Sequence, residues 1–235
     1  MTILEDEGAS AAPYEDAPVA LPRPRGPVSG WLLHRLRYPV HDIGPMPGLV
    51  DDPITGEDGP LALYLCYELH YLGLPDVDEA WEWEPSLLAA RRELERAFEA
   101  RLAELVGHPP VGLSAATTVA EVARIAHTEG GPSLSGFMAE RGTVDQMREL
   151  AIHRSAYQLK EADPHTFGIP RLTGGAKAAM VEIQRGEYGN GDPAEVHATL
   201  FGETMRLLGL DDTYGAYLEV LPATTLATVN LASFF

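Results

Sequence analysis

The sequence of 235 residues contains a single cysteine, Cys66. One cysteine excludes an internal disulfide, and it excludes any zinc or iron–sulfur site built from several cysteines. Cys66 ends the apolar run 61–66, so we expect it to be a small core residue.

Long apolar runs are also missing. No stretch approaches the roughly 20 apolar residues that a helix needs to cross a bilayer. The N-terminus carries Glu5, Asp6 and Glu7, and it lacks the basic start and apolar body of a signal peptide. These features predict a soluble, cytoplasmic protein without a membrane partner.

Basic residues are few. The chain has 17 lysines and arginines against 35 aspartates and glutamates, which gives a net charge of −18. Such a surface repels phosphate groups, so neither nucleic acid nor an anionic membrane is expected as a partner. The hydrophobic content of 45% is nevertheless sufficient for a sizeable core.

Common catalytic motifs are absent as well. The sequence has no Gly-x-Ser-x-Gly elbow, phosphate-binding loop or dinucleotide fingerprint. The pair Gly189 and Gly191 follows a predicted helix instead of a strand, so its context does not fit a nucleotide site.

Two kinds of segment divide the chain. Residues 1–28 are rich in alanine, proline and acidic residues and cannot bury enough apolar surface to become ordered, which predicts a flexible arm. A helical domain is expected over residues 29–235, with a proline- and glycine-rich loop over residues 38–60.

Helical signals then dominate. The run 61–71 is apolar on nearly every side, which predicts a buried helix, and Pro85 suits the first position of the next. Capping boxes at Thr118 with Glu121 and at Thr143 with Gln146 predict two more. The helix that begins at Thr143 should run to about residue 161, and further helices are expected over residues 174–187, 192–208 and 214–221, and from about 224 onwards. With no convincing series of strands, the predicted class is all-α.

Histidines and carboxylates are the groups that could bind a metal. This donor set suits non-heme iron, manganese or zinc, and helical bundles with inward carboxylates commonly hold two irons. The Glu-x-x-His pair of ferritin-like proteins is absent. Glu68 and His70 do not replace it, because residues two apart on a helix point in different directions.

One series of motifs is specific. It runs from His153 through Glu161 to His165, then through Glu182-Ile-Gln-Arg-Gly-Glu187-Tyr-Gly-Asn-Gly191 and His197-Ala-Thr-Leu-Phe201 to Tyr214-Gly-Ala-Tyr217. This series resembles the bacterial iron-containing redox enzyme group within the heme-oxygenase-like diiron oxidases. The likeness covers about residues 60–235 and is strongest from 150 onwards.

The resemblance implies a heme-oxygenase-like helical bundle with two Fe(II) ions, with O2 as co-substrate. Glu161 matches the glutamate of the first core helix, and Glu187 with His197 match the glutamate and histidine of the second. Each also has a structural alternative, as a solvated helix end, a surface acid and a capped core histidine respectively. Asp163, His165 and Glu182 are expected to orient ligands. Glu182 is the substitute should Glu187 not bind metal.

The spacing of Glu187 and His197 can be examined independently of the resemblance. Ten residues of unbroken helix rise about 15 Å, which is too far for ligands of two metals about 3.5–4 Å apart. A break is therefore required. The sequence provides one over residues 188–191, followed by Asp192 as N-cap and Pro193 as first helical position.

The resemblance also implies a third core helix with a histidine–carboxylate cluster, and that helix would lie beyond residue 235. The missing ligands would then come from a segment after Phe235, from a second copy of the chain in a homodimer, or from another protein. The implied function is O2-dependent oxidation of a small, amino-acid-derived metabolite, by N-oxygenation, desaturation or oxidative cleavage.

Two alternatives remain. One is a non-catalytic helical partner or scaffold that has lost the metal site. The other is a heme-degrading oxygenase, which needs a proximal histidine on an early helix, where only His34 and His70 are available.

Overall fold

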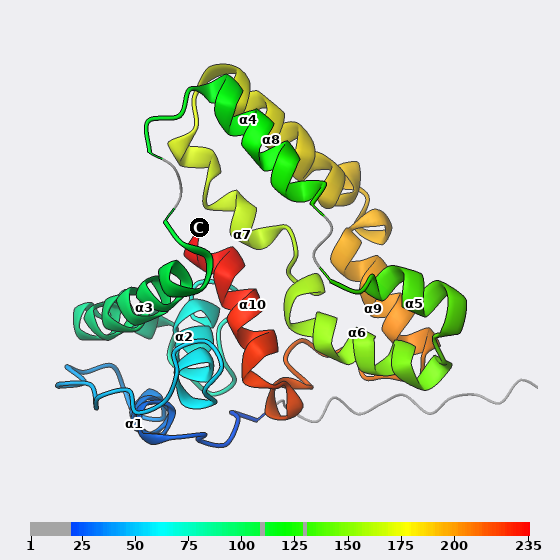
Figure 1. Ribbon diagram of the computed structural model, residues 1–235. Helices are drawn as coiled ribbons and strands as arrows, with labels where there is room; N and C mark the ends of the chain where they lie inside the picture. The colour runs from blue at the N-terminus through cyan, green and yellow to red at the C-terminus, as the bar shows by residue number, and fades with distance from the viewer. Residues whose placement is uncertain (1–19, 109–110, 129–130) are drawn as a thin grey trace, which may run out of the picture.

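The computed structural model describes residues 20–108, 111–128 and 131–235, and these residues form helices joined by loops and short 3-10 turns (Figure 1). No β-strand occurs among them, which confirms the all-α class. The helices are α1 Pro27–Leu36, α2 Asp58–Glu68, α3 Pro85–Val106, α4 Ala115–Ala126, α5 Leu134–Arg141, α6 Val144–Gln158, α7 Asp163–Thr166, α8 Gly174–Glu187, α9 His197–Leu207 and α10 Ala223–Phe234.

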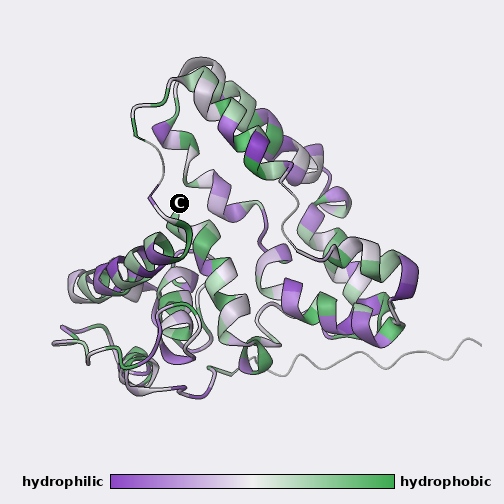
Figure 2. Ribbon diagram, viewed as in Figure 1, coloured by the Kyte–Doolittle hydropathy of each residue, from purple (hydrophilic) through white to green (hydrophobic). Residues whose placement is uncertain are grey.

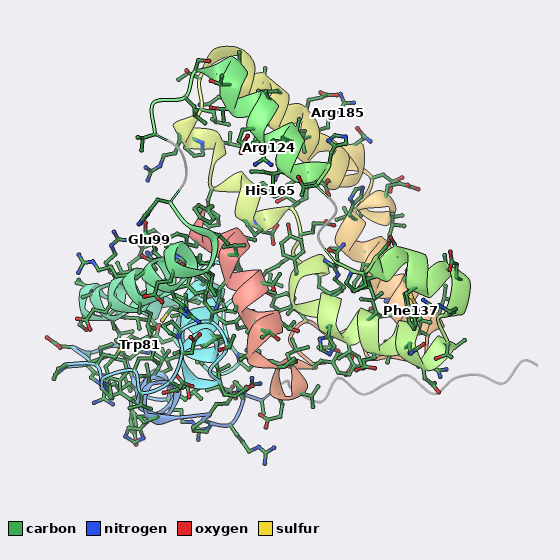
Figure 3. The ribbon with its side chains drawn as sticks, viewed as in Figure 1. Trp81, Glu99, Arg124, Phe137, His165 and Arg185 are labelled. Carbon is green, nitrogen blue, oxygen red and sulfur yellow. The ribbon has the colours of Figure 1, made fainter. Side chains whose placement is uncertain are left out.

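Helix α2 forms the centre of the core. Every residue from Asp58 to Glu68 is buried, as its continuous apolar sequence predicts. The helix packs against α1, α3 and α10, and the fully buried indole of Trp81 adds to the same cluster (Figure 3).

The segment before α1 is folded from residue 20 onwards. The predicted flexible arm covered residues 1–28, of which 1–19 lie outside the described residues. Arg25 donates hydrogen bonds to the backbone oxygens of Leu218 and Leu221, and Pro22 is buried. These contacts with the C-terminal part of the chain fix residues 20–28, which composition alone cannot reveal.

A second group of helices continues from the core. Helix α10 packs on α2 and also contacts α6, and α6 contacts α9. In Figure 2, α10 is coloured mainly from white to green, which agrees with its buried residues Leu226 and Val229. Helix α10 therefore connects the core to the helices on which the candidate site depends.

The two predicted capping boxes had different outcomes. The box of Thr143 and Gln146 is formed at the start of α6. The prediction of a capping box at Thr118 is wrong, because α4 begins at Ala115 with Ser114 as its N-cap. Ser114 precedes two alanines, which propagate a helix well, and Thr118 donates its hydroxyl to the Ser114 carbonyl instead.

Two further predictions concern the loops and the last helices. The long loop predicted over residues 38–60 is present, although α2 already begins at Asp58. The helix predicted over residues 214–221 is wrong. Only a 3-10 turn, Leu218–Val220, forms there. Among the described helices, none combines the length and apolar character that crossing a membrane would require.

Candidate metal centre

Glu161, Glu187 and His197 come together in the structure. One ligand atom from each side chain lies within 4.8 Å of the corresponding atoms of the other two. Side chains that each reach one of two ions about 4 Å apart must converge in this way. The predicted geometry is thus present. Whether the three side chains bind a metal stays a prediction.

The break after α8 brings Glu187 and His197 together. Helix α8 ends at Glu187, and an antiparallel bridge pairs Tyr188 with Val196. In that register the next opposite pair is Glu187 and His197, because opposite residues in an antiparallel pair step outward together. The histidine Nδ1 accordingly lies 2.6 Å from Glu187 Oε2.

The predicted start of the following helix needs a correction. Asp192 caps a short turn, Pro193–Glu195, by accepting from the Ala194 amide. The α-helix itself begins five residues later, at His197, because Val196 has an extended conformation. The bridge between Tyr188 and Val196 takes up the residues that were expected in the first turn of the helix.

Glu161 does not lie on a helix. Helix α6 ends at Gln158, and residues 159–162 form a turn. The predicted helix to Glu161 is therefore too long. The neighbouring Lys160 lies in this turn, and its ammonium donates a hydrogen bond to the buried Glu68 carboxylate of α2.

This buried ion pair is part of a cluster. Lys160 and Glu68 are almost fully buried, and Tyr214 donates its hydroxyl to the second oxygen of Glu68. The ammonium also lies over the rings of Tyr64 and Tyr71. The cluster anchors the turn that carries Glu161 to α2.

A second set of contacts joins this turn to α8. The buried Gln184 side chain donates to the Ala162 carbonyl at 2.7 Å and to the Thr166 hydroxyl at 2.8 Å. Gln184 precedes Glu187 by three residues and hence lies on the same face of α8. The contact places the segment of Glu161 opposite the end of α8.

Asp163 was expected to orient the ligands, and that role stays a prediction. It accepts a hydrogen bond from Tyr188, at 2.9 Å, and Tyr188 begins the break after α8. Glu182 and His165 are exposed, and neither belongs to the converging group. Figure 3 shows His165 on α7.

The donor set fits a metal ion. Glu187 Oε2 is buried, yet it accepts no hydrogen bond among the described residues, although His197 Nδ1 is close. A buried carboxylate oxygen without a donor is costly, and a cation between the three side chains would remove that cost. Two carboxylates and one imidazole suit non-heme iron, manganese or zinc.

Two tyrosines lie close to carboxylates in this region, Tyr157 near Glu161 and Glu187 and Tyr188 at Asp163. Burial raises the pKa of Tyr157, and the charges of Glu161 and Glu187 raise it further. Burial is also the main cause of the raised pKa of Tyr188. Both phenols are therefore protonated at neutral pH and can donate hydrogen bonds.

The early histidines have other surroundings. His70 lies between Glu82, which faces its Nδ1, and Arg91, which faces its Nε2. Both ring nitrogens are thus engaged. His34 is exposed on α1 and stacks edge-on with Tyr38.

Sequence reasoning missed Lys160, Gln184 and Tyr157. Only the spacing offered a signal. Gln184 stands one helical turn before Glu187, and Tyr157 stands four residues before Glu161, positions that lie on one face of a helix.

The candidate ligands lie in a segment that is similar to a known protein family. The model of a family described as iron-containing redox enzymes matches residues 148–235, which include all three candidate ligands. The family model matches from residue 148 onwards, whereas the resemblance noted in the sequence was expected to begin at about residue 60. No curated protein matches the sequence. Residues 148–235 of the chain are therefore similar to the iron-containing redox enzymes that this model describes.

Proposed function

We propose that this protein is an O2-activating non-heme diiron oxidoreductase that oxidises a small, amino-acid-derived metabolite. The similarity of residues 148–235 to iron-containing redox enzymes supports a redox role that uses iron. The observation that carries the proposal is the convergence of Glu161, Glu187 and His197 within 4.8 Å. In addition, Glu187 Oε2 accepts no hydrogen bond among the described residues, although His197 Nδ1 lies 2.6 Å away. Bound Fe(II) would supply the electrons with which O2 is reduced during N-oxygenation, desaturation or oxidative cleavage of the substrate.

The protein's own groups have distinct tasks in this proposal. The carboxylates of Glu161 and Glu187 offset the charge of the cations, and His197 contributes a neutral donor. Gln158 donates to Glu161 Oε2 at 3.0 Å, which orients that carboxylate. Tyr157 keeps its proton at neutral pH because burial and the two carboxylates raise its pKa, so it adds no negative charge.

Access also suits a reaction with small molecules. The His197 side chain is 49% exposed, whereas that of Glu187 is only 22% exposed. One side of the group therefore faces solvent, from which O2 can enter, and the other faces the protein. Three side chains supply about half of the ligands that two ions take in helical diiron proteins, and we propose that a segment after Phe235, a second copy or another chain contributes further ligands.

The test is a metal analysis. Purified protein would be loaded anaerobically with Fe(II), and bound iron would be measured for wild type, His197→Ala and the control His108→Ala. His108 is exposed and lies outside the converging group. We expect wild type to bind iron, approaching two ions in a complete site, and His197→Ala to lose most of it, while His108→Ala retains it.

The same measurement distinguishes the alternative function. A wild-type protein that binds no iron under these conditions would favour the non-catalytic helical scaffold. Equal iron in wild type and His197→Ala would contradict the assignment of this histidine.

A further inference from the structure

A cavity of about 260 Å³ opens between α6 and α10. It is separate from the three candidate ligands, none of which lines it. Its walls carry both polar and apolar side chains, namely His153, Arg154, Tyr157, Thr225, Thr228, Val229 and Ala232. This volume approaches the lower end of the range for small-molecule sites.

Tyr157 links this cavity to the candidate metal centre. Its side chain lines the cavity, and it lies within electrostatic reach of the carboxylates of Glu161 and Glu187. The tyrosine stands four residues before Glu161, and His153 stands four residues before the tyrosine. One face of α6 and the turn after it therefore connect the cavity with the ligands.

The charge at the cavity favours an anion. Arg154 lines it and makes no ion pair among the described residues. The net charge of −18 on the chain repels anions in general, so Arg154 is the group that would attract one to this cavity. Arginine offers planar, two-pronged donation that matches a carboxylate.

The remaining walls define the rest of the ligand. His153 Nδ1 and Thr225 Oγ1 form a hydrogen bond of 2.8 Å, and the Thr228 hydroxyl donates to the Thr224 carbonyl. Val229 and Ala232 add an apolar wall from α10. A short hydrocarbon body fits such walls better than a second charged group.

We propose that this cavity binds a small carboxylic acid, with its carboxylate at Arg154 and its apolar part along Val229 and Ala232. The assignment of this cavity as the substrate site of the oxidation rests on the proposed function, and it narrows the substrate class to small organic acids. The reacting end of the acid would lie on the Tyr157 side, toward the candidate ligands.

The test compares isocaproate with isocaproamide, which have nearly the same shape but differ in charge. Both would be titrated into metal-free protein and followed by the amide shifts of a ¹H–¹⁵N spectrum. We expect saturable shifts in α6 and α10 with isocaproate and at least about tenfold weaker binding of the amide, a difference of about 1.4 kcal/mol.

Four variants sharpen the test. Arg154→Gln should weaken isocaproate binding about tenfold and leave the amide unchanged, whereas Arg154→Lys should retain most of the affinity. Arg96→Gln is the matched control, since Arg96 is an exposed arginine on α3 that does not line the cavity. Ala232→Phe fills the cavity and should abolish the binding of both probes.

Several results would overturn the proposal: no saturable shifts with wild type, equal affinity for acid and amide, or equal affinity in Arg154→Gln and Arg96→Gln. Because the titration uses metal-free protein, its outcome is independent of the iron measurement. Iron binding without isocaproate binding would refute the cavity alone, and the reverse would refute the diiron function alone.

Discussion

Replacing Glu68 by glutamine should destabilise the protein strongly. The substitution removes the carboxylate that pairs with Lys160, and both residues are almost fully buried. At pH 6 the Lys160 amine carries its proton, because burial lowers its pKa only to about 7. Glu68→Gln would therefore leave a buried ammonium without its counterion.

The expected cost follows from the surroundings of the pair. Removing one partner of a buried ion pair costs about 3–5 kcal/mol, and Tyr214 also loses its charged acceptor. We expect a loss of about 4 kcal/mol in the free energy of unfolding. With a urea dependence of about 2 kcal/mol per molar, the unfolding midpoint would fall by about 2 M.

The assay is urea unfolding at pH 6 followed by circular dichroism. Glu121→Gln is the control, because Glu121 pairs with Arg124 on the exposed surface of α4, where such pairs contribute about 0–1 kcal/mol. A double replacement, Glu68→Leu with Lys160→Met, should recover most of the stability. If Glu68→Gln and Glu121→Gln had the same midpoint, the described role of the buried pair would be refuted.

Two further predictions concern the break after α8 and the pH dependence of stability. Gly189→Ala should lower the amount of bound iron, because Gly189 has φ +64° and an added Cβ would lie 2.7 Å from the Val196 nitrogen. Gly186→Ala is the control and should leave the bound iron unchanged, since an added Cβ at Gly186 would meet open space. Equal iron in both variants would contradict this prediction. Asp52→Asn should flatten the pH dependence of unfolding between about pH 4 and 2, measured by urea unfolding at a series of pH values. The backbone amides of Thr55 and Ile54, with Arg101, lower the pKa of Asp52 from 3.8 to about 2, so its contribution is present above pH 3.8 and is lost as the pH falls toward 2. An unchanged slope in the variant would refute that assignment.

The parts of the fold that the sequence predicts are those set by local chemistry. The apolar run that became α2 and the capping box of Thr143 depend on neighbouring residues. The convergence of Glu187 and His197 was also predictable, since the ten-residue spacing requires a break and the glycines permit one.

What escaped prediction depends on contacts between distant residues. Helix α6 ends at Gln158 because Lys160 turns toward Glu68, which lies 92 residues earlier in the chain. Residues 20–28 are held by Arg25, which contacts residues nearly 200 positions later. No local pattern contains such partners, so their positions follow only from the folded chain.

The bridge between Tyr188 and Val196 has a consequence for the loop that it closes. The bridge fixes the two ends of the loop, and the candidate ligands stand directly outside those ends. The ten-residue spacing between Glu187 and His197 is then set by the length of this loop and not by the geometry of a metal site. A longer or shorter tip between Gly189 and Glu195 that preserved the bridge between Tyr188 and Val196 would alter the count while Glu187 and His197 stay opposite each other.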